Sequence, residues 1–354
     1  MTKPVHRRFD QVDTTSQPGS LVDYLDQVAT SAAGTDYTRR TLHTLGAAAG
    51  QRLLEVGCGG GHALQAAAEL VGATGLVMGI DASATMAAAS QARVAGRGRV
   101  RVLVADAQRL PFADGVFDGC RAERVLQHLP DPAEALAEMV RVTRPGGLVL
   151  VGDTDWGGWL LDAPDDPATH AVLAAAAGRS RNPWIGRQLV GLFHQAGLGD
   201  LQVEVVTFPG SDFDWAARVH GLAAAVEQAI ASGALTSEQA HAWLHDRRRA
   251  AAQGQFFSAP SPHHGDRSHL NVTAGHPLGG VERPRRKERF ARLTQRRARA
   301  FWRAFGLRRL RRHLSLPWSP CRVAPRSAGS YRTPSTVNPT GQVWRGRDEF
   351  ALLR

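Results

Sequence analysis

A glycine-rich turn near the start of the chain constrains its fold more than any other feature. The largely apolar segment Arg52–Val56 predicts a buried strand, which runs directly into Gly57-Cys58-Gly59-Gly60-Gly61. A helical pattern then begins at His62. Glycines let the backbone approach a ligand closely, and the first turn of a helix presents free N–H donors. This order of strand, glycine turn and helix predicts an α/β fold that holds a ligand at the turn.

Two details distinguish the turn from a dinucleotide-binding fingerprint. The spacing is G-x-G-x-G, and His62 stands where the third glycine of G-x-G-x-x-G belongs. Glu55, two residues before the first glycine, would repel a diphosphate. These details favour a ligand that carries an amino group and no phosphate. S-adenosylmethionine (SAM) is such a ligand.

Strands and helices alternate after this turn. The expected strands are Arg52–Val56, Leu76–Ile80, Val100–Val104, one near Arg121 and Leu148–Val151, and the helices between them begin at His62 and cover Ala84–Ala95 and Asp131–Thr143. Such alternation predicts right-handed crossovers and a doubly wound, mainly parallel, Rossmann-like α/β sheet covered on both faces. Ligands of such sheets bind beyond the carboxyl ends of the strands. Four of those ends carry an acidic residue: Glu55, Asp81, Asp106 and Asp153.

The regions on either side of this core extend the pattern. Two helices, Ser20–Ala33 and Asp36–Leu45, precede the first strand. Later helices are expected at Ala168–Ala177, Ile185–Ala196, around Trp215–Ser232 and at Ser237–Gln253, with a strand at Leu201–Phe208. We therefore divide the chain into an N-terminal helical lid (1–45), the domain that carries the glycine turn (46–258) and a C-terminal tail (259–354).

The net charge of +11 is unevenly distributed along the chain. Residues 259–354 contain 21 of the 43 Lys and Arg residues but only 5 of the 32 Asp and Glu residues, so the tail carries +16 and residues 1–258 carry −5. The basic tail and the mildly acidic body therefore need separate explanations. The acidic body argues against a polyanionic partner such as RNA.

Composition also limits where the chain is expected to act. A run of about 18 apolar residues, long enough to span a membrane, does not occur. Met1–Gln17 is polar and lacks the apolar core of a signal peptide. The three cysteines have no metal-ligand spacing. We expect a cytoplasmic protein without a membrane span, a disulfide framework or a metal site.

Four short motifs follow one another in the domain 46–258. They are Leu54-Glu55-Val56-Gly57-Cys58-Gly59-Gly60-Gly61, Gly79-Ile80-Asp81-Ala82-Ser83 with Met86, Ala105-Asp106-Ala107 with Leu110-Pro111-Phe112, and Arg144-Pro145-Gly146-Gly147. In this order they resemble the motifs of class I SAM-dependent methyltransferases, in the small-molecule group that includes the ubiquinone and menaquinone methyltransferases. The stretch 123–129 is also typical of that group. The resemblance covers about residues 20–258 and implies the class I methyltransferase fold with SAM as cofactor.

The resemblance implies roles for residues on the first and fourth strands. Gly57, Gly59 and Gly61 would line the methionine portion of SAM. Glu55 would organise the glycine turn and face the SAM ammonium, directly or through water. The backbone of Arg121 would lie beside the methionine portion.

Residues after the second and third strands would hold the adenosine portion of SAM. By the resemblance, the Asp81 carboxylate would accept hydrogen bonds from both ribose hydroxyls. Asp106 would accept from the adenine amino group, and the Ala107 N–H would donate to the ring. Asp81 could instead cap the following helix, although Ser83 suits that role better. Asp106 could instead only close a turn.

Catalysis by this family needs little acid–base help, because the sulfonium of SAM is a good leaving group and positioning does most of the work. A base matters only if the acceptor must lose a proton, and His128, Asp153 and Asp155 are the candidates. His128 could equally be a helix-start histidine packed beneath the sheet edge. We expect a small, apolar or aromatic acceptor and a lid helix, with Tyr24, that excludes water.

Aromatic residues of the insert after residue 153 have two interpretations. Trp156, Trp159 and Trp184 could form an acceptor pocket, although large aromatic side chains in inserts are more often core residues. Arg187 could hold the insert through an ion pair instead of touching the acceptor.

The alternation of strands and helices stops after Ser258. By the resemblance, the sheet should end in an antiparallel pair, of which Leu201–Phe208 would be the first strand. Leu270–Ala274 is a poor substitute for the second. We therefore predict that the last strand is missing, which would leave an unpaired slot beside the fifth strand and put the activity of the chain in question.

Three explanations of the basic tail stay open. The loss of pattern and the richness in Arg, Pro, Ser and His favour a frame-shifted, non-native terminus. Alternatively, Arg285–Arg312, with 13 basic residues and one acidic residue, could bind nucleic acid or an anionic membrane. The chain would then be a nucleic-acid-binding protein or an RNA methyltransferase. The tail could also be a plain disordered segment. The oligomeric state cannot be read from the sequence.

Overall fold

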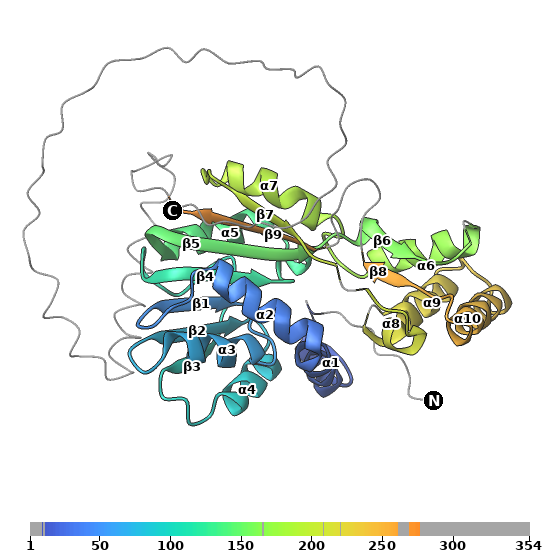
Figure 1. Cartoon of the computed structure of the whole chain (residues 1–354), viewed down its shortest axis with the longest axis horizontal. Helices are drawn as coiled ribbons and strands as arrows, with labels where there is room; N and C mark the ends of the chain where they lie inside the picture. The colour runs from blue at the N-terminus through green and yellow to red at the C-terminus, as the bar shows by residue number, and fades with distance from the viewer. Residues whose placement is uncertain are drawn as a thin grey trace, which may run out of the picture. The chain divides into compact units, whose positions relative to one another are not determined.

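The computed structural model describes Phe9 and residues 11–164, 166–207, 209–219, 221–260 and 269–276. Within these residues one sheet has the strand order β3-β2-β1-β4-β5-β9-β7, and β6 and β8 form a separate pair (Figure 1). Cys321 and the expected basic module at Arg285–Arg312 lie outside the described residues.

Five parallel strands form most of the main sheet. They are β1 (Arg52–Val56), β2 (Leu76–Asp81), β3 (Val100–Val104), β4 (Phe117–Glu123) and β5 (Thr143–Thr154), and each neighbouring pair among them is parallel. From β1 the chain first adds strands on one side, β2 and β3, and then on the other, β4 and β5. This confirms the doubly wound sheet. The strand order reverses between β1 and β4, where ligands of such sheets bind.

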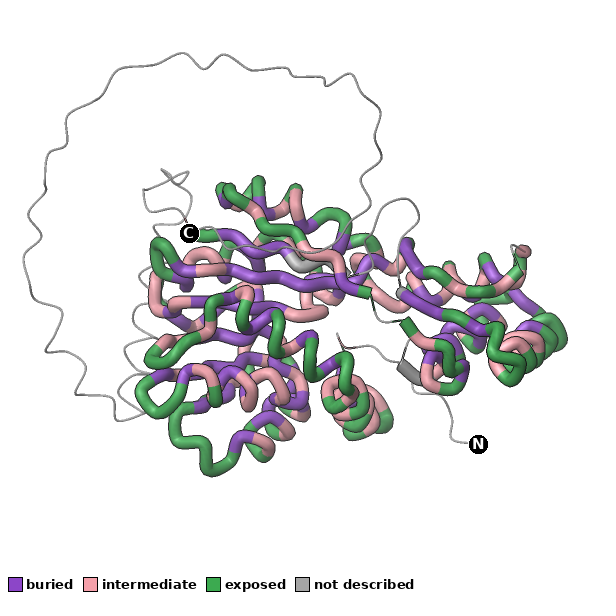
Figure 2. The backbone as a smooth tube through the Cα atoms, in the orientation of Figure 1, coloured by how far each residue is buried: buried purple, intermediate pink, exposed green. Residues whose placement is uncertain are grey.

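Helices cover both faces of this sheet. One face packs against α2 (Ala32–Thr44), α3 (His62–Val71) and α4 (Ala84–Arg93), and the other against α5 (Pro132–Val142) and α7 (Ile185–Gln195). Alternate strand residues point to opposite faces, so Leu53 joins the α2–α3 core while Leu54 and Val56 join the α5–α7 core. Figure 2 shows the resulting burial along the strands. No helix within the described residues is both long and apolar enough to cross a membrane.

The chain after β5 builds a second core. The short helix η3 (Trp156–Gly158) is followed by α6 (Pro167–Ala177), α8 (Phe213–Val219), α9 (Leu222–Ala231) and α10 (Ser237–Ala252), and β6 (Trp159–Leu161) pairs with β8 (Ser258–Pro260). Trp159 lies in this core, and its Nε1 donates to Ser258 Oγ at 3.0 Å. Of the two interpretations of Trp159, the structure therefore supports the core residue.

The strand predicted to be missing is present. β9 (His269–Gly275) lies antiparallel between β5 and β7 (Gln202–Val205), and its register with β5 runs from Leu148 opposite Gly275 to Thr154 opposite His269. The prediction of an unpaired slot is therefore wrong, and the sheet continues beyond Ser258. Few residues of this segment are strongly apolar, but the slot offers hydrogen bonds on both sides and buries Val272 completely. Tertiary context here outweighs composition.

Candidate functional site

A cavity of about 740 Å³ opens at the carboxyl edge of the sheet, around the reversal between β1 and β4. Ligand sites are usually about 300–1,000 Å³ in volume. Its wall runs from Asp81 and Asp106 past the glycine turn to Trp156 and Trp215. The structure brings all predicted cofactor residues to this wall: Glu55, Gly57, Gly59, Gly61, Asp81, Asp106, Ala107 and Arg121.

The turn between β1 and α3 depends on glycine at two positions in particular. Gly57 has φ +67° and Gly61 has φ +86°, in the left-handed region that side chains disfavour. A Cβ at Gly57 would lie 2.4 Å from Val125 Cγ2, and one at Gly61 would lie 2.9 Å from Ser90 Oγ. Both the backbone and the available space therefore require glycine, and the backbone of the turn stays accessible from the cavity.

Asp81, at the end of β2, offers acceptor capacity toward the cavity. Its Oδ2 accepts from the Gly59 N–H and its Oδ1 from the Ser83 N–H, both at 2.9 Å. A carboxylate has about four acceptor directions, and these backbone donors do not use all of them. Burial raises the pKa of Asp81 above its ordinary value, although the backbone hydrogen bonds oppose this shift. Ser83 caps α4 through Met86 N–H at 3.1 Å, so the cap role does not fall to Asp81.

Asp106 closes a turn and also lies in the cavity wall, where the predicted contact with adenine would have to be made. Its Oδ1 accepts from the Gln108 N–H at 2.9 Å, which closes a turn after β3. The residue is nevertheless exposed and lies in the cavity wall beside Ala107. Closing the turn fixes the carboxylate at the edge of the cavity.

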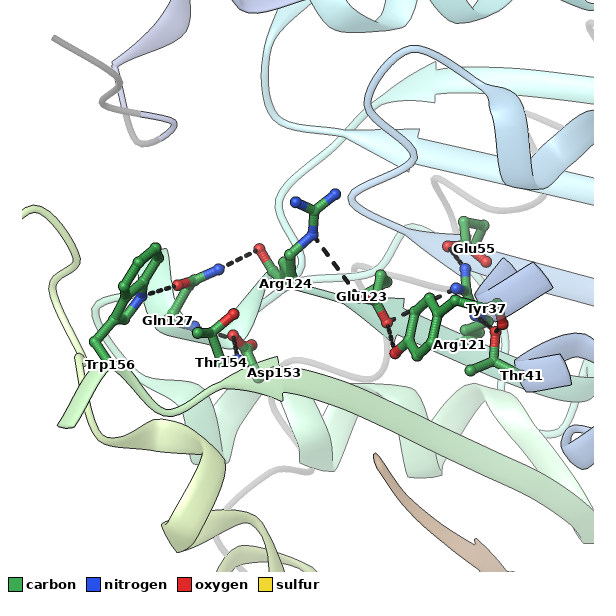
Figure 3. Close-up of polar contacts among 10 residues, drawn as sticks. All are labelled: Tyr37, Thr41, Glu55, Arg121, Glu123, Arg124, Gln127, Asp153, Thr154 and Trp156. Carbon is green, nitrogen blue, oxygen red and sulfur yellow. Dashed lines mark hydrogen bonds and ion pairs between the residues drawn. The ribbon is translucent and has the colours of Figure 1, made fainter. Parts of the chain in front are cut away.

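A charge cluster lies around the β1–β4 pair, where Glu55 stands opposite Arg121 (Figure 3). We call it the Arg121 cluster; its members are Tyr37, Thr41, Glu55, Arg121 and Glu123. Arg121 is 1% exposed, and its guanidinium pairs with Glu55, donates to Thr41 Oγ1 at 3.1 Å and lies 3.7 Å from Glu123 Oε2. The Tyr37 hydroxyl donates to Glu123. The sequence predicted only a backbone role for Arg121; Tyr37, Thr41 and Glu123 were not predicted, because their meeting depends on how α2 packs.

Two carboxylates share one guanidinium in this cluster. Burial raises the pKa of Glu55 to about 7; Arg121 opposes the shift and Glu123 reinforces it. Burial and the nearby Glu123 charge also raise the pKa of Tyr37 well above its usual value. Glu55, Arg121, Glu123 and Tyr37 all reach the cavity wall, so the cluster sets the charge there.

The N-terminal segment is tied to the site at two places. On α1 (Pro18–Thr30), Asp26 Oδ1 lies 2.8 Å from His62 Nε2 and 2.6 Å from an Arg93 nitrogen, beside the glycine turn. Burial opposes ionisation of Asp26, but hydrogen bonds from His62 and Arg93 hold its pKa below the ordinary value. Tyr24 and Leu25 of α1 contribute to the cavity wall.

The second tie involves Asp13 in the short helix η1 (Val12–Thr14). Its carboxylate accepts from Ser83 Oγ at 2.7 Å, from the Ala84 N–H at 2.8 Å and from the Thr85 N–H at 3.1 Å, at the start of α4. These hydrogen bonds, chiefly that from Ser83, lower the pKa of Asp13 to about 2. The segment before α1 is thereby fixed against α4.

The three candidate bases lie in different surroundings. His128, in η2 (Leu126–His128), is part of the cavity wall, and its ring lies 5.5 Å from the Phe9 ring. Asp153 is fully buried outside that wall, where its carboxylate accepts from the backbone of Gln127 and Thr154. Asp155 pairs with the Arg187 guanidinium at 2.5 and 2.7 Å. Of the three, only His128 lines the cavity.

The two remaining tryptophans differ in position. Trp156 lines the cavity and donates from Nε1 to Gln127 Oε1 at 2.7 Å. Trp184 is 53% exposed and lies outside the cavity wall. Arg187, which pairs with Asp155, also lies outside it, in agreement with an ion-pair role.

Comparisons with known proteins indicate a methyltransferase domain in this chain. A family model described as a methyltransferase domain matches residues 54–151. An uncharacterized 37.1 kDa protein in transposon TN4556 of Streptomyces fradiae is 38% identical over 239 residues, which cover 67% of this chain and 68% of that protein. Demethylmenaquinone methyltransferase of Staphylococcus aureus (strain MRSA252) is 33% identical over 150 residues, which cover 42% of this chain and 60% of that relative.

A solved structure shows the same fold. Phosphoethanolamine N-methyltransferase 2 of Haemonchus contortus, in complex with S-adenosyl-L-methionine, aligns with a TM-score of 0.51 and 20% identity, covering 78% of this chain and 61% of that chain. At this identity the likeness concerns the fold alone.

Proposed function

Because this chain belongs to the class I SAM-dependent methyltransferases, we propose that it transfers a methyl group from SAM to a small-molecule acceptor. The observation that carries this proposal is a single cavity that reaches from Asp81 and Asp106 to Trp156, with side chains of α1 in its wall. A concave space of this size suits a small acceptor better than a macromolecule. The relative named as a demethylmenaquinone methyltransferase supports the same class of acceptor.

The residues present suit SAM. We assign the Asp81 carboxylate to the ribose hydroxyls. Asp106 accepts from the adenine amino group, and the Ala107 N–H donates to the ring. The backbone of the glycine turn follows the methionine portion, with Glu55 and the Arg121 backbone beside it. When bound by these residues, SAM would supply an electrophilic methyl group and a neutral thioether as leaving group.

The protein's own contribution is position, exclusion of water and removal of a proton. We propose that α1, with Tyr24 and Leu25 in the cavity wall, closes the cavity and keeps water from the sulfonium. His128 takes the proton of an acceptor hydroxyl or amine when one is released, because its imidazole lines the cavity and histidine is the side chain that most often acts as a general base. Asp153 supports this loop through the backbone of Gln127 and is not proposed as the base.

Binding of SAM by the full chain, measured by titration calorimetry, tests the proposal. Asp81→Ala should weaken SAM binding by about 1–3 kcal/mol, roughly 5- to 150-fold. Asp114→Ala, at an ion pair with Arg141 where the aspartate side chain is 71% exposed, is the matched control and should leave binding unchanged. An unmodified protein that does not bind SAM would contradict the proposal. A screen of quinones, phenols and polyketides with methyl-labelled SAM would then identify the acceptor.

A further inference from the structure

Arg124, the residue after β4, has a backbone conformation that is unusual for an arginine. Its φ is +54°, and glycine or asparagine is the ordinary choice there. The neighbouring structure enforces this conformation: the Arg124 N–H donates to Gly152 O at 2.8 Å, and its carbonyl accepts from Gln127 Nε2 at 3.3 Å. Non-glycine residues held in this way occur mainly at functional sites, where the side chain is needed at that position.

Arg124 is part of the cavity wall, in the same stretch of lining as Gln127 and His128. Figure 3 shows it between the Arg121 cluster on one side and Gln127 and Trp156 on the other, extended away from both. The nearest acid is Glu123, whose Oε1 lies 3.8 Å from Arg124 Nε, which is an ion-pair distance but too long for a hydrogen bond. The side chain is 33% exposed. Most N–H groups of the Arg124 guanidinium are therefore available to donate hydrogen bonds to a ligand.

The cavity wall contains three other arginines, of which Arg181 is exposed and the other two hold contacts within the protein. Arg121 serves Glu55 and Glu123 within its cluster. Arg179 donates to Gly221 O at 3.0 Å. The guanidinium of Arg124 is therefore less engaged than those of Arg121 and Arg179.

The wall next to Arg124 is aromatic and rigid. Gln127 is 3% exposed, and its Oε1 accepts from Trp156 Nε1 at 2.7 Å and from Ser180 Oγ at 3.2 Å. Its Nε2 donates to the Arg124 carbonyl. One buried amide thus fixes both the indole and the arginine backbone. A flat apolar ligand that carries an anionic group matches this pair of neighbours.

The total charge of the cavity wall determines whether a monoanion or a dianion binds more favourably. The described lining contains five acids (Asp13, Glu55, Asp81, Asp106 and Glu123) and four arginines (Arg121, Arg124, Arg179 and Arg181). Its formal charge is therefore −1, and Glu123 lies beside Arg124. A dianion such as a phosphate monoester would be repelled more strongly than a monoanion. The arginine fork matches a carboxylate bidentately.

We infer that Arg124 is a specificity-determining residue that binds a carboxylate on the methyl acceptor, which makes the acceptor an aromatic carboxylic acid. This inference rests on the proposed function, and it adds the acceptor's chemical class. Bidentate contact with the guanidinium would also fix the orientation of the acceptor ring against Trp156, with its nucleophilic atom directed toward the methyl group.

The test measures binding to full-length protein saturated with S-adenosylhomocysteine. The probes are 4-hydroxybenzoate, its methyl ester and phenyl phosphate, which share a ring and differ in charge. The unmodified protein should bind the acid about tenfold more tightly than the ester, and phenyl phosphate more weakly than the acid. Arg124→Gln should abolish the preference for the acid, and Arg124→Lys should retain part of it. Arg101→Gln, at an exposed arginine of β3 outside the cavity wall, should change nothing.

A second variant separates binding from folding. Glycine suits the Arg124 backbone, so Arg124→Gly should lose the preference for the acid while its thermal midpoint is not lowered. A protein that binds SAM but shows no preference for acid over ester overturns the inference and leaves the proposed function intact. Failure to bind SAM overturns the proposed function itself. If Arg124→Gln weakens SAM binding and keeps the acid preference, the guanidinium serves the cofactor and the inference is wrong.

Discussion

Replacement of Arg121 by methionine should destabilise the protein strongly and in a pH-dependent way. The arginine is 1% exposed and is shared by Glu55, 6% exposed, and Glu123. Breaking a buried ion pair by removing one partner costs about 3–5 kcal/mol. Since folded domains are stable by only about 5–15 kcal/mol, this is a large fraction of the total. Urea unfolding followed by circular dichroism measures the loss.

The pH dependence follows from Glu55. Its pKa in the folded protein is raised from 4.5 to about 7, so this group's contribution to stability is complete below about pH 4.5 and declines as the pH rises through 7. Without Arg121 the pKa of Glu55 in the folded protein rises further. Each added pKa unit lowers the free energy of unfolding by about 1.4 kcal/mol when the pH is above the new pKa. At about pH 5.5 Glu55 is mostly protonated in both folded proteins. The deficit of Arg121→Met should therefore be larger at pH 8 than at pH 5.5.

Two further variants make this prediction refutable. Adding Glu55→Gln to Arg121→Met removes the stranded charge and should recover at least about 1 kcal/mol at pH 8. Arg144→Met makes the same change at a surface pair, where the arginine is 46% exposed and lies 2.7 Å from Asp118, and should cost less than about 1 kcal/mol. A deficit no larger than that of the control, or one that is equal at both pH values and is not rescued, would refute the reasoning.

Three other predictions concern the lid, the turn and the tail. Asp13→Asn should speed proteolysis before α1. In the unmodified protein the stabilising effect of the Asp13 carboxylate should be complete above about pH 4 and should disappear as the pH falls through 2. The hydrogen-exchange rates of η1 in the two proteins should therefore become equal at about pH 2. Gly61→Ala should cost about 1–3 kcal/mol in urea unfolding and weaken SAM binding in calorimetry, because φ is +86° and the new Cβ would meet Ser90; unchanged stability would contradict the described turn. A chain that stops after His276 should keep its circular dichroism and SAM binding, whereas one that stops after Ser258 should lose both, because only the first contains β9.

The sequence predicted the parallel part of the fold well because its signals there are local. β1 and β3 match the expected ranges Arg52–Val56 and Val100–Val104, and α3 begins at His62 as expected. Apolar runs, a glycine turn and helix caps suffice for such elements. β9 was missed because its stability comes from the two strands beside it, which no local pattern reveals.

The site was predictable only in the part that motifs describe. The acids at the ends of β2 and β3 and the glycine turn follow from the sequence, since parallel strands bring their carboxyl ends together. The Arg121 cluster depends on Glu55 and Arg121 standing opposite each other in the β1–β4 register, and on α2 bringing Tyr37 and Thr41 over them. The left-handed backbone of Arg124 has no sequence signature, because arginine does not favour it.

The position of β9 has a consequence for the order of folding. Residues His269–Gly275 pair with Leu148–Thr154 across more than a hundred intervening residues, although they occupy an interior place in the sheet. During synthesis the edge of β5 that pairs with β9 therefore stays unpaired until the helices of the second core have been synthesised. Such long-range closure is slow, and an open strand edge can pair with other chains. The yield of folded protein should depend on how well β5 is shielded in that interval, by chaperones or by low temperature, more than on the final stability of the sheet.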